Sequence, residues 1–132
     1  MKKTGSKFLD SSAWLSYLFA ENDEIKEIID SDGLLYTSVI SLFEIRRKFL
    51  REKIPVKDQK KALNFIKSVS IVIDLNEVIA ERASEISHHK GLHAMDALIY
   101  TSALSTESIL VTGDSDFEGL KDVLVIGRKD AL

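Results

Sequence analysis

The sequence contains no cysteine and only one proline among its 132 residues. Without thiols the chain cannot form disulfides, thiolate zinc sites or a cysteine nucleophile, which fits a reducing compartment. It has no repeat, no low-complexity segment and no linker rich in glycine, proline or serine. No apolar run approaches the roughly 18 residues of a membrane span. With 45% hydrophobic and 30% charged residues, the composition is that of a globular chain.

The N-terminal region is the one candidate for an export signal, because three lysines precede the apolar-looking segment 8–20. Polar residues interrupt that segment: Asp10, Ser11, Ser12 and Ser16. A signal peptide requires an uninterrupted apolar core, so we expect a soluble, cytoplasmic protein without membrane association. The length is that of one ordinary domain, which we expect to span residues 1–132 and to fold without a structural metal ion.

The net charge of −3 argues against a protein that grips nucleic acid by bulk charge alone, but the charge is uneven. Basic residues crowd the segment 46–67, opposed only by Glu52 and Asp58: Arg46, Arg47, Lys48, Arg51, Lys53, Lys57, Lys60, Lys61 and Lys67. Two interpretations remain open. The segment is either a solvated helix pair, or a surface through which Arg47 and Arg51 contact RNA phosphates or an acidic partner segment.

Hydrophobic periodicity predicts short strands alternating with helices along the whole chain. Strands are expected at residues 7–10, 34–37, 70–74, 109–112 and 123–126. Helices are expected from Ser11 or Ser12 to about residue 19, and at 23–30, 39–53, 56–68, 77–89 and 94–106. The β-branched run at 70–74 predicts a strand buried on both faces. Trp14 and the phenylalanines are assigned to the core.

This alternation indicates an α/β fold with a parallel sheet covered by helices on both faces. Ligands of such sheets bind beyond the carboxyl ends of the strands. Asp10 directly follows the first predicted strand, and Asp114 and Asp116 follow the fourth. Acidic residues therefore stand where the chemistry of α/β proteins takes place.

Two further acids, Glu44 and Asp96, lie among apolar residues of predicted helices. Taken singly, Glu44 is explained by an ion pair with Arg47 or Lys48, and Asp96 by its helix N-terminus. Asp10 and Asp114 are likewise explained as a cap and a turn residue. Together they suggest a different chemistry, because Mg²⁺ and Mn²⁺ take carboxylate oxygens as ligands. A loose ring of carboxylates around such a cation suits phosphodiester cleavage.

The order of these acids and their flanking residues resembles the PIN domain, specifically the small VapC-type toxin ribonucleases. The resemblance covers essentially the whole chain and implies a sheet of four or five parallel strands between helices. It implies a Mg²⁺ or Mn²⁺ site. The catalytic and metal-binding residues that it implies are Asp10, Glu44, Asp96, Asp114 and, with less support, Asp116, with Ser12 and Thr112 as supporting polar residues. Gly113 departs from the pattern, since many relatives carry a larger residue there.

The resemblance implies that activated water attacks an RNA phosphodiester, leaving 5′-phosphate and 3′-hydroxyl ends. It also implies a homodimer, for which the helices near residues 20–50 are the expected surface, and an antitoxin that occludes the cleft. A PIN nuclease of RNA maturation or decay would carry the same acids, so this alternative stays open. A non-catalytic receiver-like module is disfavoured, because Asp10 lacks an acidic neighbour.

Several residues allow two interpretations. Tyr100, one turn after Asp96, either faces the cleft and stacks on a base or belongs to the core. His89 and His93 stand four apart, but Lys90-Gly91 breaks the helix between them, so we expect both, with His88, to face solvent.

Overall fold

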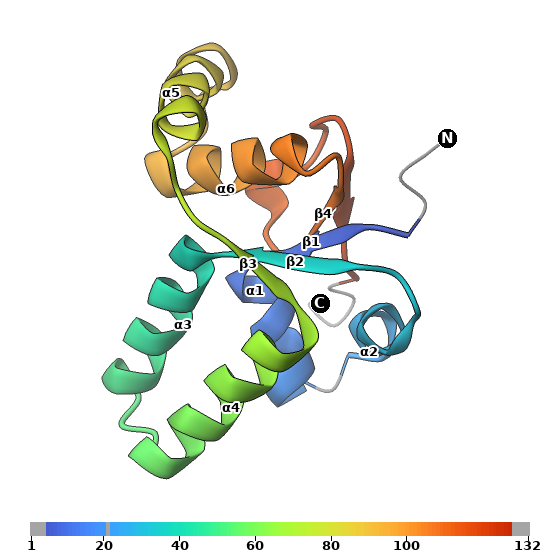
Figure 1. The fold of residues 1–132 in the computed structure, drawn as a ribbon, viewed down its shortest axis with the longest axis vertical. Coiled ribbons are helices and arrows are strands. Elements are labelled where there is room, and N and C mark those ends of the chain that lie inside the picture. The colour runs from blue at the N-terminus through green and yellow to red at the C-terminus, as the bar shows by residue number, and fades with distance from the viewer. Residues whose placement is uncertain (1–4, 21, 128–132) are drawn as a thin grey trace.

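The computed structural model describes residues 5–20 and 22–127, and its centre is a five-stranded sheet in the order β3-β2-β1-β4-β5 (Figure 1). The strands are β1 (Lys7–Leu9), β2 (Leu35–Ser38), β3 (Ile71–Ile73), β4 (Ile109–Thr112) and β5 (Val123–Val125). All neighbouring pairs are parallel. The α/β class and the parallel sheet expected from the sequence are confirmed.

Helices cover both faces of this sheet, as Figure 1 shows. They are α1 (Ser11–Leu15), the π-helical turn η1 (Ser16–Ala20), α2 (Asp23–Asp30), α3 (Val39–Arg51), α4 (Val56–Val69), α5 (Glu77–Lys90), α6 (Ala94–Ser105) and the short 3-10 helix η2 (Ser115–Phe117). Within the described residues, no helix is both long and apolar enough to cross a membrane.

Two hydrophobic cores form because successive side chains of a strand point to opposite faces. In β1, Phe8 joins the core beneath α5 and α6, whereas Leu9 joins the core of α1 to α4. In β4, Leu110 and Val111 divide in the same way. The middle residues of β1 and β4 are therefore apolar on both faces of the sheet, and the polar residues Asp10 and Thr112 stand at the carboxyl ends of these strands.

The start of α1 is fixed from two sides, which matters because it carries acidic and hydroxyl residues. The Asp10 carboxylate, rather than the expected Ser11 or Ser12, caps the helix by accepting from the Ala13 amide at 2.9 Å. Below it, the buried Trp14 indole donates to Thr37 Oγ1 at 3.0 Å, and Thr37 donates to the Leu9 carbonyl at 2.8 Å. These bonds tie α1 to both β1 and β2.

Two expectations about burial are wrong. The strand at 70–74 was expected to be buried on both faces, but β3 lies at the sheet edge and Ile71 is 48% exposed. Phe19 and Phe43 were assigned to the core, yet they are 57% and 52% exposed. Strand order and the angle at which a helix rests on the sheet decide these exposures, and local sequence encodes neither.

Gly33 marks a close approach of two chain segments before β2. A Cβ atom at this position would lie 1.9 Å from the Gly5 carbonyl oxygen, so no other residue fits without movement of the backbone. Lys7 N donates to the Leu34 carbonyl at 2.9 Å just beyond this point. The bend at Asp32-Gly33 is thus the place where the chain brings β1 and β2 together.

Candidate active site

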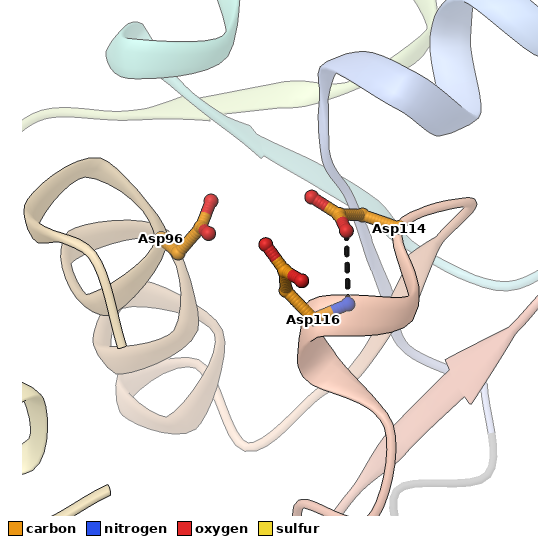
Figure 2. A group of neighbouring side chains, drawn as sticks. All are labelled: Asp96, Asp114 and Asp116. Carbon is orange, nitrogen blue, oxygen red and sulfur yellow. Dashed lines mark hydrogen bonds between the residues drawn. The ribbon is translucent and has the colours of Figure 1, made fainter. Parts of the chain in front are cut away.

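Three carboxylates from two separate segments meet beyond the carboxyl end of β4 (Figure 2). Asp96 projects from the first turn of α6, Asp114 follows β4, and Asp116 belongs to η2. One oxygen of each lies within 4.8 Å of the others. Asp114 accepts from the Asp116 amide at 2.9 Å, and the buried Phe117 anchors the turn. The loop conformation therefore turns both of its acids toward α6.

Asp10 lies at the end of β1 and is only 4% exposed. Its Oδ1 accepts from Ser12 Oγ at 2.7 Å and from the Ala13 amide at 2.9 Å, and its Oδ2 accepts from Thr112 Oγ1 at 2.6 Å. A carboxylate offers about four lone-pair sites, so one site on Oδ2 remains for a further partner.

Two hydroxyl groups join Asp10 to the loop after β4. Thr112 Oγ1 donates to Asp10 and accepts from the Asp114 amide at 2.9 Å. Ser12 Oγ donates to Asp10 and accepts from the Gly113 amide at 2.7 Å. Both residues were expected to support the acids. A Cβ at Gly113 would meet Ser12 Oγ at an ordinary 3.5 Å, so this departure from the family pattern does not reflect a lack of space.

Glu44 lies on α3 and accepts from Ser11 Oγ at 2.9 Å. The alternative explanation by an ion pair with Lys48 or Arg47 is not what the structure contains. Lys48 pairs with Glu52 at 2.7 Å, and Arg47 stacks over the Phe43 ring. Ser11 was considered only as a possible helix cap, and its position directly after Asp10 was the one signal of a role at the site.

The acids act on one another electrostatically. Burial raises the pKa of Asp10 to about 6, opposed by its hydrogen bonds with Thr112, Ser12 and Ala13. Burial also raises the pKa of Asp96 to about 6, and the charges of Asp114, Glu44 and Asp116 add to the effect. The negative charge of Glu44 raises the pKa of both Asp10 and Asp96, so Glu44 lies close enough to both carboxyls to affect their ionisation.

These shifts predict that the metal-free protein loses stability as the pH rises through about 6. Both carboxyls have folded-state pKa values above their ordinary 3.8, so folding favours their protonated forms. Their contribution to the unfolding free energy is therefore fully present below pH 3.8 and is lost as the pH rises above 6. For Asp10 the loss is at most about 3 kcal/mol. Urea unfolding between pH 4 and 8 in a chelating buffer measures it. An unfolding free energy that stays constant across this pH range, and that does not change when Mg²⁺ or Mn²⁺ is added, would contradict the prediction.

The donor set fits a hard divalent cation. Asp96, Asp114 and Asp116 offer oxygens close enough to share one ion, and Asp10 has a lone pair free. No thiol is available in the chain, and His88, His89 and His93 are exposed, as expected. A site made of oxygen ligands alone suits Mg²⁺ or Mn²⁺ better than zinc.

The residues considered as possible RNA or partner contacts differ in exposure to solvent. Arg47 and Arg51 are exposed on α3, the helix of Glu44, and thus open to a ligand. Tyr100 is only 4% exposed, and its hydroxyl donates to the Lys121 carbonyl at 2.8 Å. Of the two interpretations of Tyr100, this position favours the one that assigns it to the core.

Comparison with known proteins agrees with this geometry. The sequence model of a family described as the PIN domain matches residues 7–123. No curated protein matches the sequence. Among solved structures, a toxin–antitoxin complex from Klebsiella pneumoniae aligns with TM-score 0.74 and 22% identity, covering 89% of this chain and 95% of that one. VapBC2 from Rickettsia felis, bound to a promoter DNA fragment, gives 0.72 at 18% identity, covering 90% and 96%.

A third solved structure, Mycobacterium tuberculosis VapC20, is described as a sarcin-ricin loop cleaving toxin. It aligns with TM-score 0.69 and 18% identity, covering 89% of this chain and 96% of that one. At these identities the three likenesses concern the fold.

Proposed function

Because the chain belongs to the PIN domain family, we propose that it is a divalent-metal-dependent ribonuclease. The observation that carries the proposal is the meeting of Asp96, Asp114 and Asp116 within 4.8 Å at the carboxyl edge of the sheet. Burial and mutual repulsion raise the pKa of Asp96, so the cluster is unfavourable in the metal-free fold. A carboxyl whose pKa is raised by burial and by neighbouring negative charges is typical of a functional site.

Each acid has a distinct proposed role. Bound Mg²⁺ or Mn²⁺ supplies positive charge that lowers the pKa of a coordinated water and stabilises charge on phosphate oxygens. Asp96, Asp114 and Asp116 hold the cation, and Asp10 adds its free Oδ2 lone pair. Ser11 occupies one oxygen of Glu44, whose carboxylate holds or orients the attacking water. Attack on the RNA phosphodiester leaves 5′-phosphate and 3′-hydroxyl ends.

We further propose that the protein is the toxin of a toxin–antitoxin pair. Support comes from the solved structures of similar fold, which include toxin–antitoxin complexes and a toxin that cleaves the sarcin-ricin loop. In this role the protein acts in the cytoplasm as a homodimer, and a small antitoxin covers the acidic site until it is removed. RNA is the proposed substrate, rather than DNA, on the same support.

The metal dependence is tested directly with purified protein and a pool of structured RNAs. We expect cleavage with Mg²⁺ or Mn²⁺, its loss with EDTA, and its return when the metal is restored in excess, because the proposed mechanism relies on the cation to lower the pKa of the attacking water and to neutralise phosphate charge. Denaturing gels and end-group analysis measure the products. Protein with Asp96→Asn, purified in the same way, controls for contaminating nucleases. Cleavage that persists in EDTA would refute the metal mechanism.

A further inference from the structure

An exposed aromatic ring stands next to a candidate site residue in the sequence. Among the aromatic side chains of residues 5–20 and 22–127, only Phe19 and Phe43 are exposed. Phe43 precedes Glu44 on α3 and is 52% exposed, although a phenylalanine of an amphipathic helix is usually buried. Phe19 lies at the far end of η1, nine residues beyond Asp10, and packs edge-on against Phe49. Phe43 is thus the exposed ring whose sequence neighbour belongs to the site.

Arg47 holds this ring in place. Its guanidinium lies 5.1 Å from the centroid of Phe43, one helical turn away, in cation–π geometry. A guanidinium stacked on a ring keeps its N–H edge available for phosphate. Even with this contact, about half of the Phe43 surface remains exposed. Phe43 and Arg47 together, the Phe43–Arg47 pair, present an aromatic face and a cation side by side.

The charge around the site favours a nucleic acid at this pair. Asp96, Asp114 and Asp116 meet at the candidate active site, and the charge of Glu44 also acts on Asp96. This concentration of negative charge repels a polyanion unless cations stand nearby. On the helix that carries Glu44, the exposed cations are Arg46, Arg47 and Arg51. Arg46 Nε donates to Gln59 Oε1 at 2.8 Å, and Glu52, the acid that follows the helix, is engaged by Lys48. The Phe43–Arg47 pair is therefore a positively charged surface on the same helix as Glu44.

We propose that the Phe43–Arg47 pair is a nucleotide subsite, in which an unpaired base of the RNA stacks on Phe43 and an adjacent phosphate contacts Arg47. This inference rests on the proposed ribonuclease function and assigns to it a single-stranded substrate segment. Base stacking on aromatic rings is sequence-tolerant and requires an unpaired base. Phe43 on α3 thus takes the stacking role that was one of the two interpretations of Tyr100.

A protein partner is the competing occupant, because Leu50 is also 55% exposed on α3. Leu50 lies seven residues after Phe43, roughly 10 Å along the helix. A second copy of this chain, or another protein, would cover both apolar side chains, whereas a stacked base needs only the ring. Leu50→Ala is therefore the matched control for substitutions at Phe43.

The experiment measures binding of a short unpaired fluorescent RNA in the Asp96→Asn background, so that cleavage does not interfere. Phe43→Leu, which keeps an apolar side chain without a ring, should weaken binding by roughly five- to a hundredfold, as expected for one base–aromatic stack. Phe43→Tyr and Phe43→Trp should retain it, Leu50→Ala should not change it, and fully paired RNA should lose the dependence on residue 43. Circular dichroism and light scattering verify fold and oligomeric state.

The outcomes separate this inference from the ribonuclease proposal. If wild-type protein cleaves RNA but Phe43→Leu binds as tightly as the Phe43 form, the subsite is refuted and the enzyme stands. A change of oligomeric state in Phe43→Leu, or an equal loss in Leu50→Ala, assigns the surface to a protein interface and also refutes it. Ring-dependent RNA binding without cleavage by the wild type would support the subsite while refuting the nuclease.

Discussion

Asp96→Asn should abolish RNA cleavage, by roughly a thousandfold or more, while stabilising the metal-free protein. The loss follows because an amide oxygen is a neutral, weaker ligand than a carboxylate, and the charge stabilisation from a bound cation amounts to several kcal/mol. Asp96 is the α6 member of the three-acid cluster, and neither Asp114 nor Asp116 can replace it from the other side (Figure 2).

The gain in stability has an electrostatic origin. Burial and the charges of Asp114, Glu44 and Asp116 raise the pKa of Asp96 to about 6, so at pH 7 its ionised form opposes folding. The full shift would correspond to about 3 kcal/mol, and partial exposure of the side chain reduces our expectation to about 1 kcal/mol. Asparagine removes this cost, because it carries no charge at any pH.

Cleavage assays, growth on induced expression and thermal melting in EDTA measure the three consequences. Wild-type expression should arrest growth, and Asp96→Asn should not. Glu81→Gln, at an exposed position of α5, removes one carboxylate elsewhere and should leave cleavage and growth arrest unchanged. Full cleavage by well-folded Asp96→Asn would sink the assignment of this residue. A lower melting temperature of the metal-free variant would sink the electrostatic account.

Thr112→Val should damage both the fold and the site, although no charge is changed. The Thr112 hydroxyl is the donor to Asp10 Oδ2 at 2.6 Å and the acceptor for the Asp114 amide at 2.9 Å. Valine has the same shape and leaves both buried groups without this partner. We expect a loss of about 2 to 3 kcal/mol in unfolding free energy. Cleavage should fall by roughly ten- to a hundredfold, as when groups that orient metal ligands are lost.

Thr112→Ser is the matched control, since it keeps the hydroxyl and removes only a methyl group. It should retain most of the cleavage activity and a substantial part of the stability. Denaturant unfolding and RNA cleavage under saturating Mn²⁺ measure the two effects. If Thr112→Val retains as much stability and cleavage as Thr112→Ser, the hydrogen-bond bridge between Asp10 and the loop of Asp114 has no functional role.

The sequence was informative wherever local physics decides the structure. Alternating strands and helices were predictable because hydrophobic period and capping residues act over a few neighbouring positions. The bounds of α2 and β4 match the expectation in full, and α3 and α5 begin where expected because Ser38 and Asn76 cap them. Asp10, Asp114 and Asp116 were expected at strand ends, where parallel strands present their carboxyl edge to ligands.

Long-range packing decided the rest, because side-chain environments depend on segments far apart in the chain. Which acids can meet follows from the packing of α6 against the loop after β4, which brings Asp116 beside Asp96. The sheet order, which no local pattern encodes, exposes β3 at the edge. The rotation of α3 about its axis exposes Phe43, contrary to expectation, and that of α6 decides between the two interpretations of Tyr100 by burying it. Sequence alone thus determined the acids and the class of fold, whereas tertiary structure decided which acids meet and which surface lies beside them.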